Sequence, residues 1–306
     1  MTKKKTRDYQ ISASTALWNS LHNTPDKDPL VVMPTGSGKS HTMGVVAGGL
    51  LQTYPHVRIM NVVHVKELVK NNYEALLEVL PTAPAGIYSS GLGRKEVRQI
   101  TFAGIGSVVG KEKPFGRIDF LFVDEAHRIS DKDASSYQKL IRALRATNPQ
   151  MIVIGFTATD WRMGSGKLTD SGIFDHVCYD LGSGEAFLWM LEQGYLIRPT
   201  PKATQSRVDA DDISIRKGEF DATEAAAAFD LIIEPAIDEI IAKGQDRDAW
   251  LIFAQSIEHT EIIAEMISDK GYPAAAIHSK MPEKQRDRIL EDFLAGHVNV
   301  SGGLAC

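Results

Sequence analysis

The segment VVMPTGSGKS, residues 31–40, constrains the fold of this chain more than any other feature of its sequence. The apolar run LVVM leads directly into a loop with two glycines, and a segment of helical periodicity follows. A loop between a strand and a helix can point its backbone N–H groups at phosphate oxygens, beside the positive end of the helix dipole. The segment therefore predicts a phosphate-binding loop on a strand of an α/β sheet.

Individual residues of this loop have expected parts in binding a nucleoside triphosphate. Gly36 and Gly38 would let the backbone turn toward the β- and γ-phosphates. Lys39 would reach the terminal phosphates, and the hydroxyl of Ser40 would ligate Mg²⁺. Met33 stands where the general GxxxxGK(S/T) pattern has glycine, which favours the PTGxGKS form of the loop.

Short apolar runs alternate with segments of helical periodicity from residue 30 onward, as in a parallel sheet covered by helices. In the first half we expect strands at residues 30–33, 58–63, 100–102, 120–123 and 151–156, and helices at 11–21, 39–53, 66–80 and 134–145. In the second half we expect strands at residues 250–253, 274–277 and 297–300, and helices at 222–243, 257–269 and 282–294. The expected fold class is α/β, with two parallel-sheet lobes in tandem.

The segment FLFVDEAHR ends an apolar strand with two carboxylates and a histidine. The carboxyl end of a strand in an open α/β sheet borders the ligand crevice. Asp124 would therefore hold Mg²⁺, mostly through water, and Glu125 would polarise the attacking water. His127 could pass a hydrogen bond toward the next strand end. Taken alone, the segment fits a strand followed by a solvated acidic turn equally well.

The segment GFTATDWR also follows an apolar strand. The hydroxyls of Thr157 and Thr159 could connect the acidic strand end to the far lobe, although threonine at a strand end is often only a cap. Near the N-terminus, Arg7, Tyr9 and Gln10 precede a helix, and an aromatic ring with an amide can read adenine.

Composition limits the remaining classes of function. The 306 residues suffice for about two domains, and the formal charge of −5 provides no global basic field for nucleic acid. Only Cys178 and Cys306 are present, and the nine histidines show no HExxH spacing, which argues against a disulfide framework or a zinc site. No segment has the apolar length of a signal peptide or a membrane span, so we expect a cytoplasmic protein with no membrane partner.

The motifs RDYQ, MPTGSGKS, VVHVKELVKNN, VDEAHR and GFTATDWR, in this order, resemble the nucleotide-binding lobe of superfamily 2 helicases of the DEAH-box kind. The segments SSGLGRKE, VDEAHRISD, GFTATDWRMGSGK and LEQGYLIRP look closer still to RadD-type DNA repair helicases and their phage relatives. The resemblance extends over about residues 7–300. It implies RecA-like lobes, ATP with Mg²⁺ as the energy source, and nucleic acid bound across both lobes.

The resemblance also assigns roles to single residues. For adenine it implies Arg7, Tyr9 and Gln10. For the phosphates and Mg²⁺ it implies Thr35, Gly36, Ser37, Gly38, Lys39 and Ser40. For Mg²⁺ and water activation it implies Asp124 and Glu125, and for coupling hydrolysis to lobe movement it implies His127, Thr157 and Thr159. Lys66 would face nucleic-acid phosphates. Asp160 stands where the family usually has proline, so the coupling role is less firmly carried over than the binding role.

The domains expected are residues 1–180 as the first RecA-like lobe, 181–200 as a linker and 201–306 as a partial second lobe. Arg286 matches the family's Glu/Gln-Arg pair, but the chain reads SGGLAC where the family continues toward a QxxGRxxR helix. An arginine finger is worth about 10³ to 10⁵ in rate. We therefore expect ATP·Mg²⁺ binding with poor hydrolysis, an open edge on the strand at 298–300, and marginal stability beyond about residue 200.

Three functions fit these observations. The first is an ATP-dependent DNA helicase or translocase in DNA repair or phage DNA metabolism, with repair or replication proteins as partners. The second is a non-catalytic ATP-gated DNA-binding module, and the third is the motor subunit of a restriction system. The preference for DNA over RNA comes from the resemblance alone.

Overall fold

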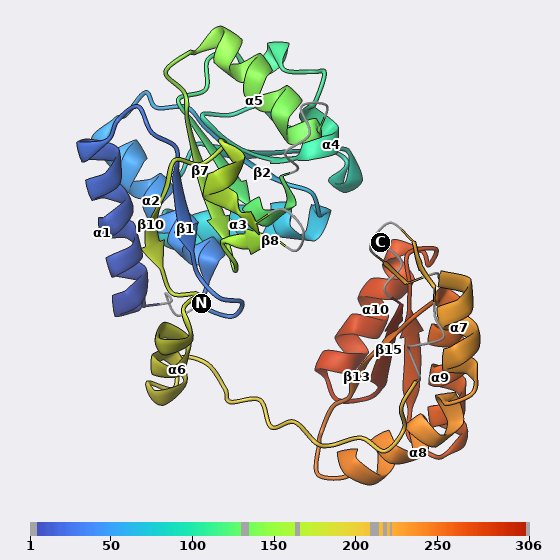
Figure 1. Cartoon of the computed structure of the whole chain (residues 1–306). Coiled ribbons are helices and arrows are strands. Elements are labelled where there is room, and N and C mark those ends of the chain that lie inside the picture. Colours follow the sequence, from blue (N-terminus) through green and yellow to red (C-terminus); the bar gives the residue numbers. More distant parts are fainter. Residues whose placement is uncertain are drawn as a thin grey trace. The chain divides into compact units, whose positions relative to one another are not determined.

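The computed structural model describes residues 5–129, 135–162, 166–208, 214–216, 219–220 and 222–303 (Figure 1). The chain forms two compact units, Met1–Arg198 and Pro199–Cys306. Among the described residues, no helix is both long enough and apolar enough to cross a membrane.

The first unit is built on an eight-stranded sheet with the order β10-β1-β7-β6-β2-β5-β3-β4. All neighbouring strands are parallel except the antiparallel pair β3 and β4. The strands of the sheet are β1 Pro29–Val32, β2 Ile59–Val63, β3 Ala85–Ser89, β4 Arg94–Lys95, β5 Ile100–Gly104, β6 Phe120–Asp124, β7 Ile152–Thr157 and β10 His176–Asp180. A separate short hairpin joins β8 Trp161–Arg162 to β9 Gly166–Lys167.

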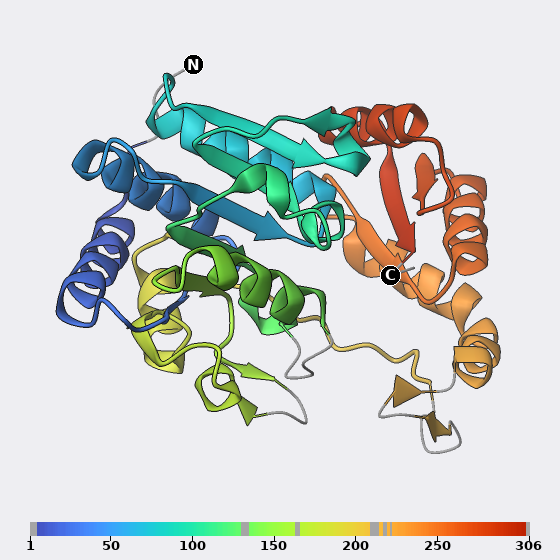
Figure 2. The same cartoon turned by 90° about the horizontal axis from the view of Figure 1, so that it is seen from above.

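Apolar side chains of the sheet face both ways, which explains why helices cover both of its faces. Along β1, Leu30 and Val32 belong to one buried cluster while Val31 belongs to another, because successive side chains of a strand point to opposite faces. One cluster includes residues of α1 Asp8–Asn23, α2 Lys39–Thr53, α3 Lys66–Val79 and α6 Gly184–Glu192. The other includes residues of α4 Ile105–Val108 and α5 Ser136–Thr147, and these helices can be followed in Figure 2.

Expected and observed elements of the first unit agree most closely where the sequence is most apolar. The five expected strands and the helices from residues 39 and 66 are present, shifted by a few residues at their ends. Five strands were not expected: the two-residue strands β4, β8 and β9, the strand β3, which contains small residues, and β10, which pairs with β1 at the sheet edge. The helix expected at 134–145 begins at Ser136, because the Ser135 hydroxyl caps it by accepting from the backbone N–H of Gln138 at 3.3 Å; residue 134 lies outside the described residues.

The segment expected as a linker, 181–200, contains a helix of the first unit. Within α6, Met190 is fully buried in the cluster that also holds α1 and α2. The second compact unit begins only at Pro199.

A buried carboxylate connects three parts of the first unit. Asp28, just before β1, accepts a hydrogen bond from the backbone N–H of Val153 at 2.7 Å and pairs with Arg145 of α5. Burial raises the pKa of Asp28, against the opposing effects of Val153 and Arg145.

The second unit is smaller and its sheet has the order β13-β15-β14, with all pairs parallel. Its strands are β13 Leu251–Ala254, β14 Ala274–Ile277 and β15 Asn299–Gly303, with a separate hairpin of β11 Ile215–Arg216 and β12 Glu219–Phe220. Its helices are α7 Ala222–Asp230, α8 Ile233–Gly244, α9 Ile257–Asp269 and α10 Glu283–Leu294. Ile237, Trp250 and Ile267 form its buried cluster.

Two expectations for this unit are wrong. The single helix expected at 222–243 is two helices, because Pro235 has no N–H and its ring clashes with the carbonyl of Leu231, so it fits only the first turn of a new helix. The strand expected at 298–300 with an open edge is β15, which pairs on both sides and lies in the centre of its sheet.

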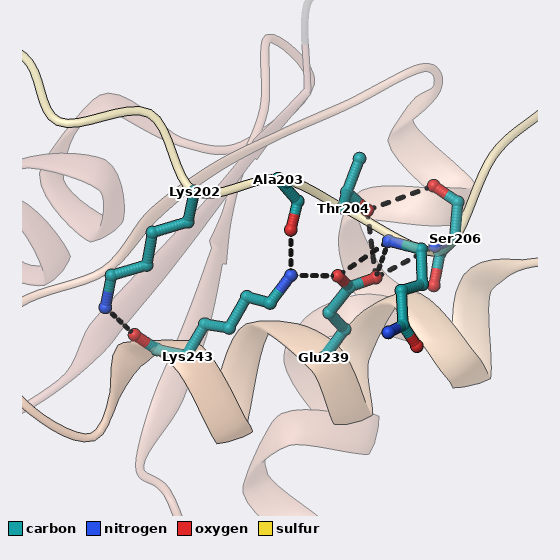
Figure 3. A network of polar contacts seen from close by, with 7 residues as sticks. Lys202, Ala203, Thr204, Ser206, Glu239 and Lys243 are labelled. Atoms are coloured by element: carbon teal, nitrogen blue, oxygen red, sulfur yellow. Dashed lines mark hydrogen bonds and ion pairs between the residues drawn. The ribbon is translucent and has the colours of Figure 1, made fainter.

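The stretch that opens the second unit is fixed along α8 by one carboxylate (Figure 3). Glu239 accepts from the Thr204 hydroxyl at 2.8 Å and from the backbone N–H of Ser206 at 2.9 Å. Lys243, one turn further along α8, pairs with Glu239 and donates to the carbonyl of Ala203. The hydrogen bond from Lys243, followed by those from the backbone, holds the pKa of Glu239 well below its usual range.

Candidate functional site

The loop between β1 and α2 has the backbone shape that its glycines predict. Gly36 and Gly38 both have φ of 83°, a left-handed conformation that side chains other than glycine rarely adopt. A Cβ on Gly38 would lie 2.6 Å from Nε2 of Gln10, so this position has no space for a side chain. Met33, where the general pattern has glycine, is fully buried and donates its N–H to the carbonyl of Thr157 at 2.8 Å, which makes it a strand-end core residue.

The N-terminal triad lies directly on this loop. The Tyr9 hydroxyl donates to the carbonyl of Ser37 at 2.7 Å, and Nε2 of Gln10 donates to the same carbonyl at 3.0 Å. Oε1 of Gln10 accepts from the backbone N–H of Arg7 at 2.9 Å, and Nη1 of Arg7 donates to the Tyr9 hydroxyl at 3.0 Å. Arg7, Tyr9 and Gln10 are therefore joined to one another and to the middle of the loop.

The two consecutive carboxylates at the carboxyl end of β6, Asp124 and Glu125, point in different directions. Glu125 faces the loop, with its Oε1 3.7 Å from Nζ of Lys39. Its backbone has φ of 53°, and no other non-glycine residue in the described part of the chain has a positive φ. Such strain persists only where the surrounding structure holds it, and functional sites are where it is concentrated. Asp124 is only 2% exposed.

A buried amide network holds Asp124, and the sequence reading missed it. Nδ2 of Asn72 donates to Oδ2 of Asp124 at 2.9 Å and lies 3.3 Å from Oδ1 of Asn61, while Oδ1 of Asp124 accepts from the backbone N–H of Glu125 at 2.9 Å. Burial raises the pKa of Asp124, and the hydrogen bond from Asn72 opposes that shift. One signal was available: Asn72 falls between Val69 and Leu76 on the buried face of α3.

The predicted coupling residues are in contact through one hydroxyl. Nδ1 of His127 lies 3.1 Å from Oγ1 of Thr157 and 3.4 Å from Oε2 of Glu125. The hydroxyl of Thr157 donates to the carbonyl of Thr159 at 2.9 Å. Burial lowers the pKa of His127, against the effect of Glu125.

Lys66, the predicted nucleic-acid contact, lies away from the loop residues. It is the first residue of α3, and its stem packs against Gly91 in the short 3₁₀ helix Ser90–Leu92. It therefore belongs to the region beyond the carboxyl ends of β2 and β3.

The donor set of the site fits a nucleotide with its magnesium ion. The described residues contain no cluster of three or more His, Cys, Asp or Glu side chains suited to a metal. Mg²⁺ commonly takes one or two protein oxygens and completes its shell with phosphates and water. Ser40 and Asp124 are such oxygens, and both oxygens of Asp124 already accept hydrogen bonds, which suits contact through water.

The left-handed glycine loop, the lysine on it and the buried carboxylate at the end of β6 define a P-loop nucleotide-binding protein. Two family models match the chain: "Type III restriction enzyme, res subunit" over residues 3–161 and "Helicase conserved C-terminal domain" over residues 233–301. The first covers half of the chain. The chain therefore belongs to this family of superfamily 2 helicases.

Individual relatives are distant in sequence. A "51.5 kDa protein" of a Lactococcus phage is 23% identical, with 89% of this chain aligned to 53% of the relative. "ATP-dependent RNA helicase DBP3" of Kluyveromyces lactis is 24% identical, with 90% aligned to 52%. The chain thus spans about half the length of these curated relatives. Among solved structures, "ATP-dependent Type ISP restriction-modification enzyme LlaBIII bound to DNA" matches with a TM-score of 0.59 and 12% identity, over 99% of this chain and 24% of the other.

These comparisons confirm the expected fold of tandem RecA-like lobes. The family is one of helicase motors, which bind ATP and hydrolyse it in dependence on nucleic acid. The narrower likeness to RadD-type repair helicases stays a prediction.

Proposed function

We propose that this chain carries the motor of an ATP-dependent DNA translocase or helicase. The observation that carries the proposal is the convergence of Lys39, Glu125 and Asp124 on one loop, 3.7 Å separating the lysine nitrogen from the glutamate oxygen. A lysine for the terminal phosphates and a carboxylate for the attacking water are the parts that phosphoryl transfer to water requires.

Each residue of the site has a role in this proposal. The backbone N–H groups of residues 36–40 bind the phosphates, and Ser40 and Asp124 hold Mg²⁺, which supplies charge neutralisation when bound. Glu125 orients and deprotonates the water, and its strained backbone aims the carboxylate at the loop. Arg7, Tyr9 and Gln10 accept adenine.

Coupling to the nucleic acid follows a second path. The His127 ring links Glu125 to Thr157, so a change at the γ-phosphate can alter the turn at residues 157–159. Lys66, together with the helix N-terminus where it lies, binds the phosphate backbone of the strand. DNA is the proposed substrate, and a repair or phage pathway is the proposed setting; RNA is the alternative that a relative named as an RNA helicase raises.

A motor subunit of a restriction system is the second candidate. The family description and the fold likeness to a restriction-modification enzyme bound to DNA favour it. A third candidate, an ATP-gated binding module, would use the same loop without turnover.

Steady-state ATP hydrolysis by the purified chain tests these proposals. The assay compares no nucleic acid, single-stranded DNA, forked DNA, uninterrupted duplex DNA and single-stranded RNA. We expect slow turnover that DNA stimulates and that falls to background in Lys39→Ala and Glu125→Gln, because both remove charge or base function from the transition state. Lys66→Ala should weaken the stimulation by DNA and leave basal turnover unchanged.

Lys70→Ala is the matched control for Lys66→Ala, because Lys70 is an exposed lysine of the same helix and pairs only weakly with Glu74 at 3.9 Å. Equal turnover in the wild type, Lys39→Ala and Glu125→Gln would contradict an ATPase. ATP binding without turnover on every substrate would favour the ATP-gated module. Stimulation by uninterrupted duplex DNA alone would favour the restriction motor. Stimulation by RNA alone would mean that RNA, and not DNA, is the substrate.

A further inference from the structure

The turn that follows α6 is firmly attached to the core of the first unit. Gly194 takes a left-handed conformation with φ of 69°, and the chain then folds back over the helix end. The carbonyl of Met190 accepts from the N–H groups of Tyr195 at 2.9 Å and Leu196 at 3.2 Å. Because the Met190 side chain is fully buried, the turn has a fixed position on the first unit.

Tyr195 uses this position to contact the residues proposed to read the base. Its ring lies 4.8 Å from the ring of Tyr9, edge to face, and the guanidinium of Arg7 lies 5.4 Å from its centroid. Arg7 also donates to the Tyr9 hydroxyl, so its guanidinium is held from two directions. An exposed arginine would otherwise sample many rotamers, at a cost in entropy when a ligand orders it.

Leu196, the next residue, contacts the phosphate loop. A Cβ on Gly36 would lie 3.1 Å from Cδ2 of Leu196, so the leucine packs against the backbone of the loop. Two consecutive side chains thus contact the adenine-reading residues and the phosphate loop.

We propose that Tyr195 is a positioning residue of the nucleotide site, which orders the guanidinium of Arg7 for a purine base. The inference rests on the proposed function, because it assumes that ATP occupies the loop. Tyr195 acts through the guanidinium of Arg7, whereas the phosphates are bound by the loop itself. Loss of the ring should therefore weaken recognition of the nucleoside and spare recognition of the phosphates.

Equilibrium binding of ATP, GTP and inorganic tripolyphosphate to the full chain, with Mg²⁺, tests the proposal. For Tyr195→Ala we expect the Kd for ATP to rise about 2- to 30-fold, the range of an aromatic contact with a cation. The preference for ATP over GTP should shrink, and the Kd for tripolyphosphate should stay within about 2-fold. Tyr195→Phe keeps the ring and should bind as the wild type does.

Trp189→Ala is the matched control, because its ring lies 5.6 Å from that of Tyr195 and 6.4 Å from that of Tyr9, in the same aromatic cluster. It should leave ATP binding unchanged. The double variant Arg7→Ala/Tyr195→Ala should bind ATP no more weakly than Arg7→Ala, since a residue that acts through another adds nothing once that one is gone.

Three outcomes would overturn the inference: wild-type ATP affinity in Tyr195→Ala, equal loss of ATP and tripolyphosphate, or additive effects in the double variant. A wild-type chain that binds neither ATP nor tripolyphosphate would instead refute the proposed function.

Discussion

The two compact units differ in how completely their sheets are covered. In the first unit every residue of β1 is buried, and two apolar clusters lie on the two faces of the sheet. In the second unit Leu251 and Phe253 of β13 are 55% and 66% exposed within the described part of the chain, and the buried cluster is formed by Ile237, Trp250 and Ile267. Since buried apolar area supplies most of the stability of a domain, the first unit should be much the more stable.

The units also differ in the role of their hydrogen-bonded carboxylates. The carboxylates of Asp28 and Asp124 are buried in the first unit, and burial raises the pKa of both. The carboxylate of Glu239 in the second unit is fixed by Lys243 and backbone donors, which lower its pKa. The first unit can tolerate buried charges at its site because its core is large, whereas the second unit uses a carboxylate to hold its chain in place.

The largest expected effect concerns the buried carboxylate of Asp124. Asp124→Asn should reduce the slow, DNA-stimulated ATP hydrolysis to background, because it removes the carboxylate proposed to hold Mg²⁺. The melting temperature should not fall, since the variant removes a desolvated charge and Asn72 can turn its amide to accept from the new one. Hydrolysis and melting are measured on the same samples, with the exposed Asp26→Asn as control. A large drop in stability would mean that Asp124 is mainly structural.

The same truncation in both units tests the difference in their cores. Ile154 and Ile267 are both fully buried, and Ile→Ala costs about 2 to 5 kcal/mol. Ile154→Ala should leave a cooperative transition at lower urea concentration, whereas Ile267→Ala should abolish the transition of the second unit. Trp250 is the tryptophan of that unit and reports on it by fluorescence, while hydrogen exchange follows both units. A single common transition that both variants shift equally would contradict the expectation that the two units differ in stability.

A matched pair of glycine substitutions, one in each unit, should have a smaller effect and tests backbone strain without a change in packing. Gly110 and Gly271 have φ of 77° and 89°, and a Cβ at either position would meet nothing within 4 Å. Gly110→Ala and Gly271→Ala should each cost about 1 to 2 kcal/mol from the left-handed backbone alone. Chemical denaturation should show the loss in the first unit for one variant and in the second for the other. Equal denaturation midpoints for variant and wild type would contradict the expected cost of an alanine in the left-handed conformation.

The smallest expected effect is a difference between the two units in how their stability depends on pH. A lowered folded pKa means that Glu239 contributes stability above its unfolded value of 4.5, and this contribution is lost as pH falls toward the folded value. Asp28 and Asp124 have raised pKa values, so their contribution is present below 3.8 and is lost as pH rises through the folded values. Below pH 4.5 the second unit should therefore weaken relative to the first. Glu239→Gln should remove that dependence, and parallel pH profiles in the wild type would contradict it.

Much of the fold could be predicted from the sequence because the central strands carry their own signal. Strands β2, β6 and β7 are apolar runs, and their expected ends differ from the observed ones by one residue at most. Strand β10 could not be found this way, since its five residues carry only a short apolar run and an edge strand takes its conformation from its partner β1. The break before α8 was available in Pro235 and was overlooked.

The candidate site divides in the same manner. Lys39, Asp124 and Glu125 were predicted because the loop and the acidic strand end are contiguous motifs. Asn72 lies in helix α3 and Asp124 ends strand β6, and no local pattern predicts a contact between residues 52 positions apart.

Three features follow from the amino-acid sequence because each depends on neighbouring residues and on the period of the chain: the phosphate loop, the acidic end of β6 and the alternation of strands and helices. The tertiary structure alone decided that β15 lies between β13 and β14, that Asn72 holds Asp124, and that Tyr195 lies beneath Arg7. These contacts join distant segments, and their partners are selected by packing and by the need to satisfy buried polar groups.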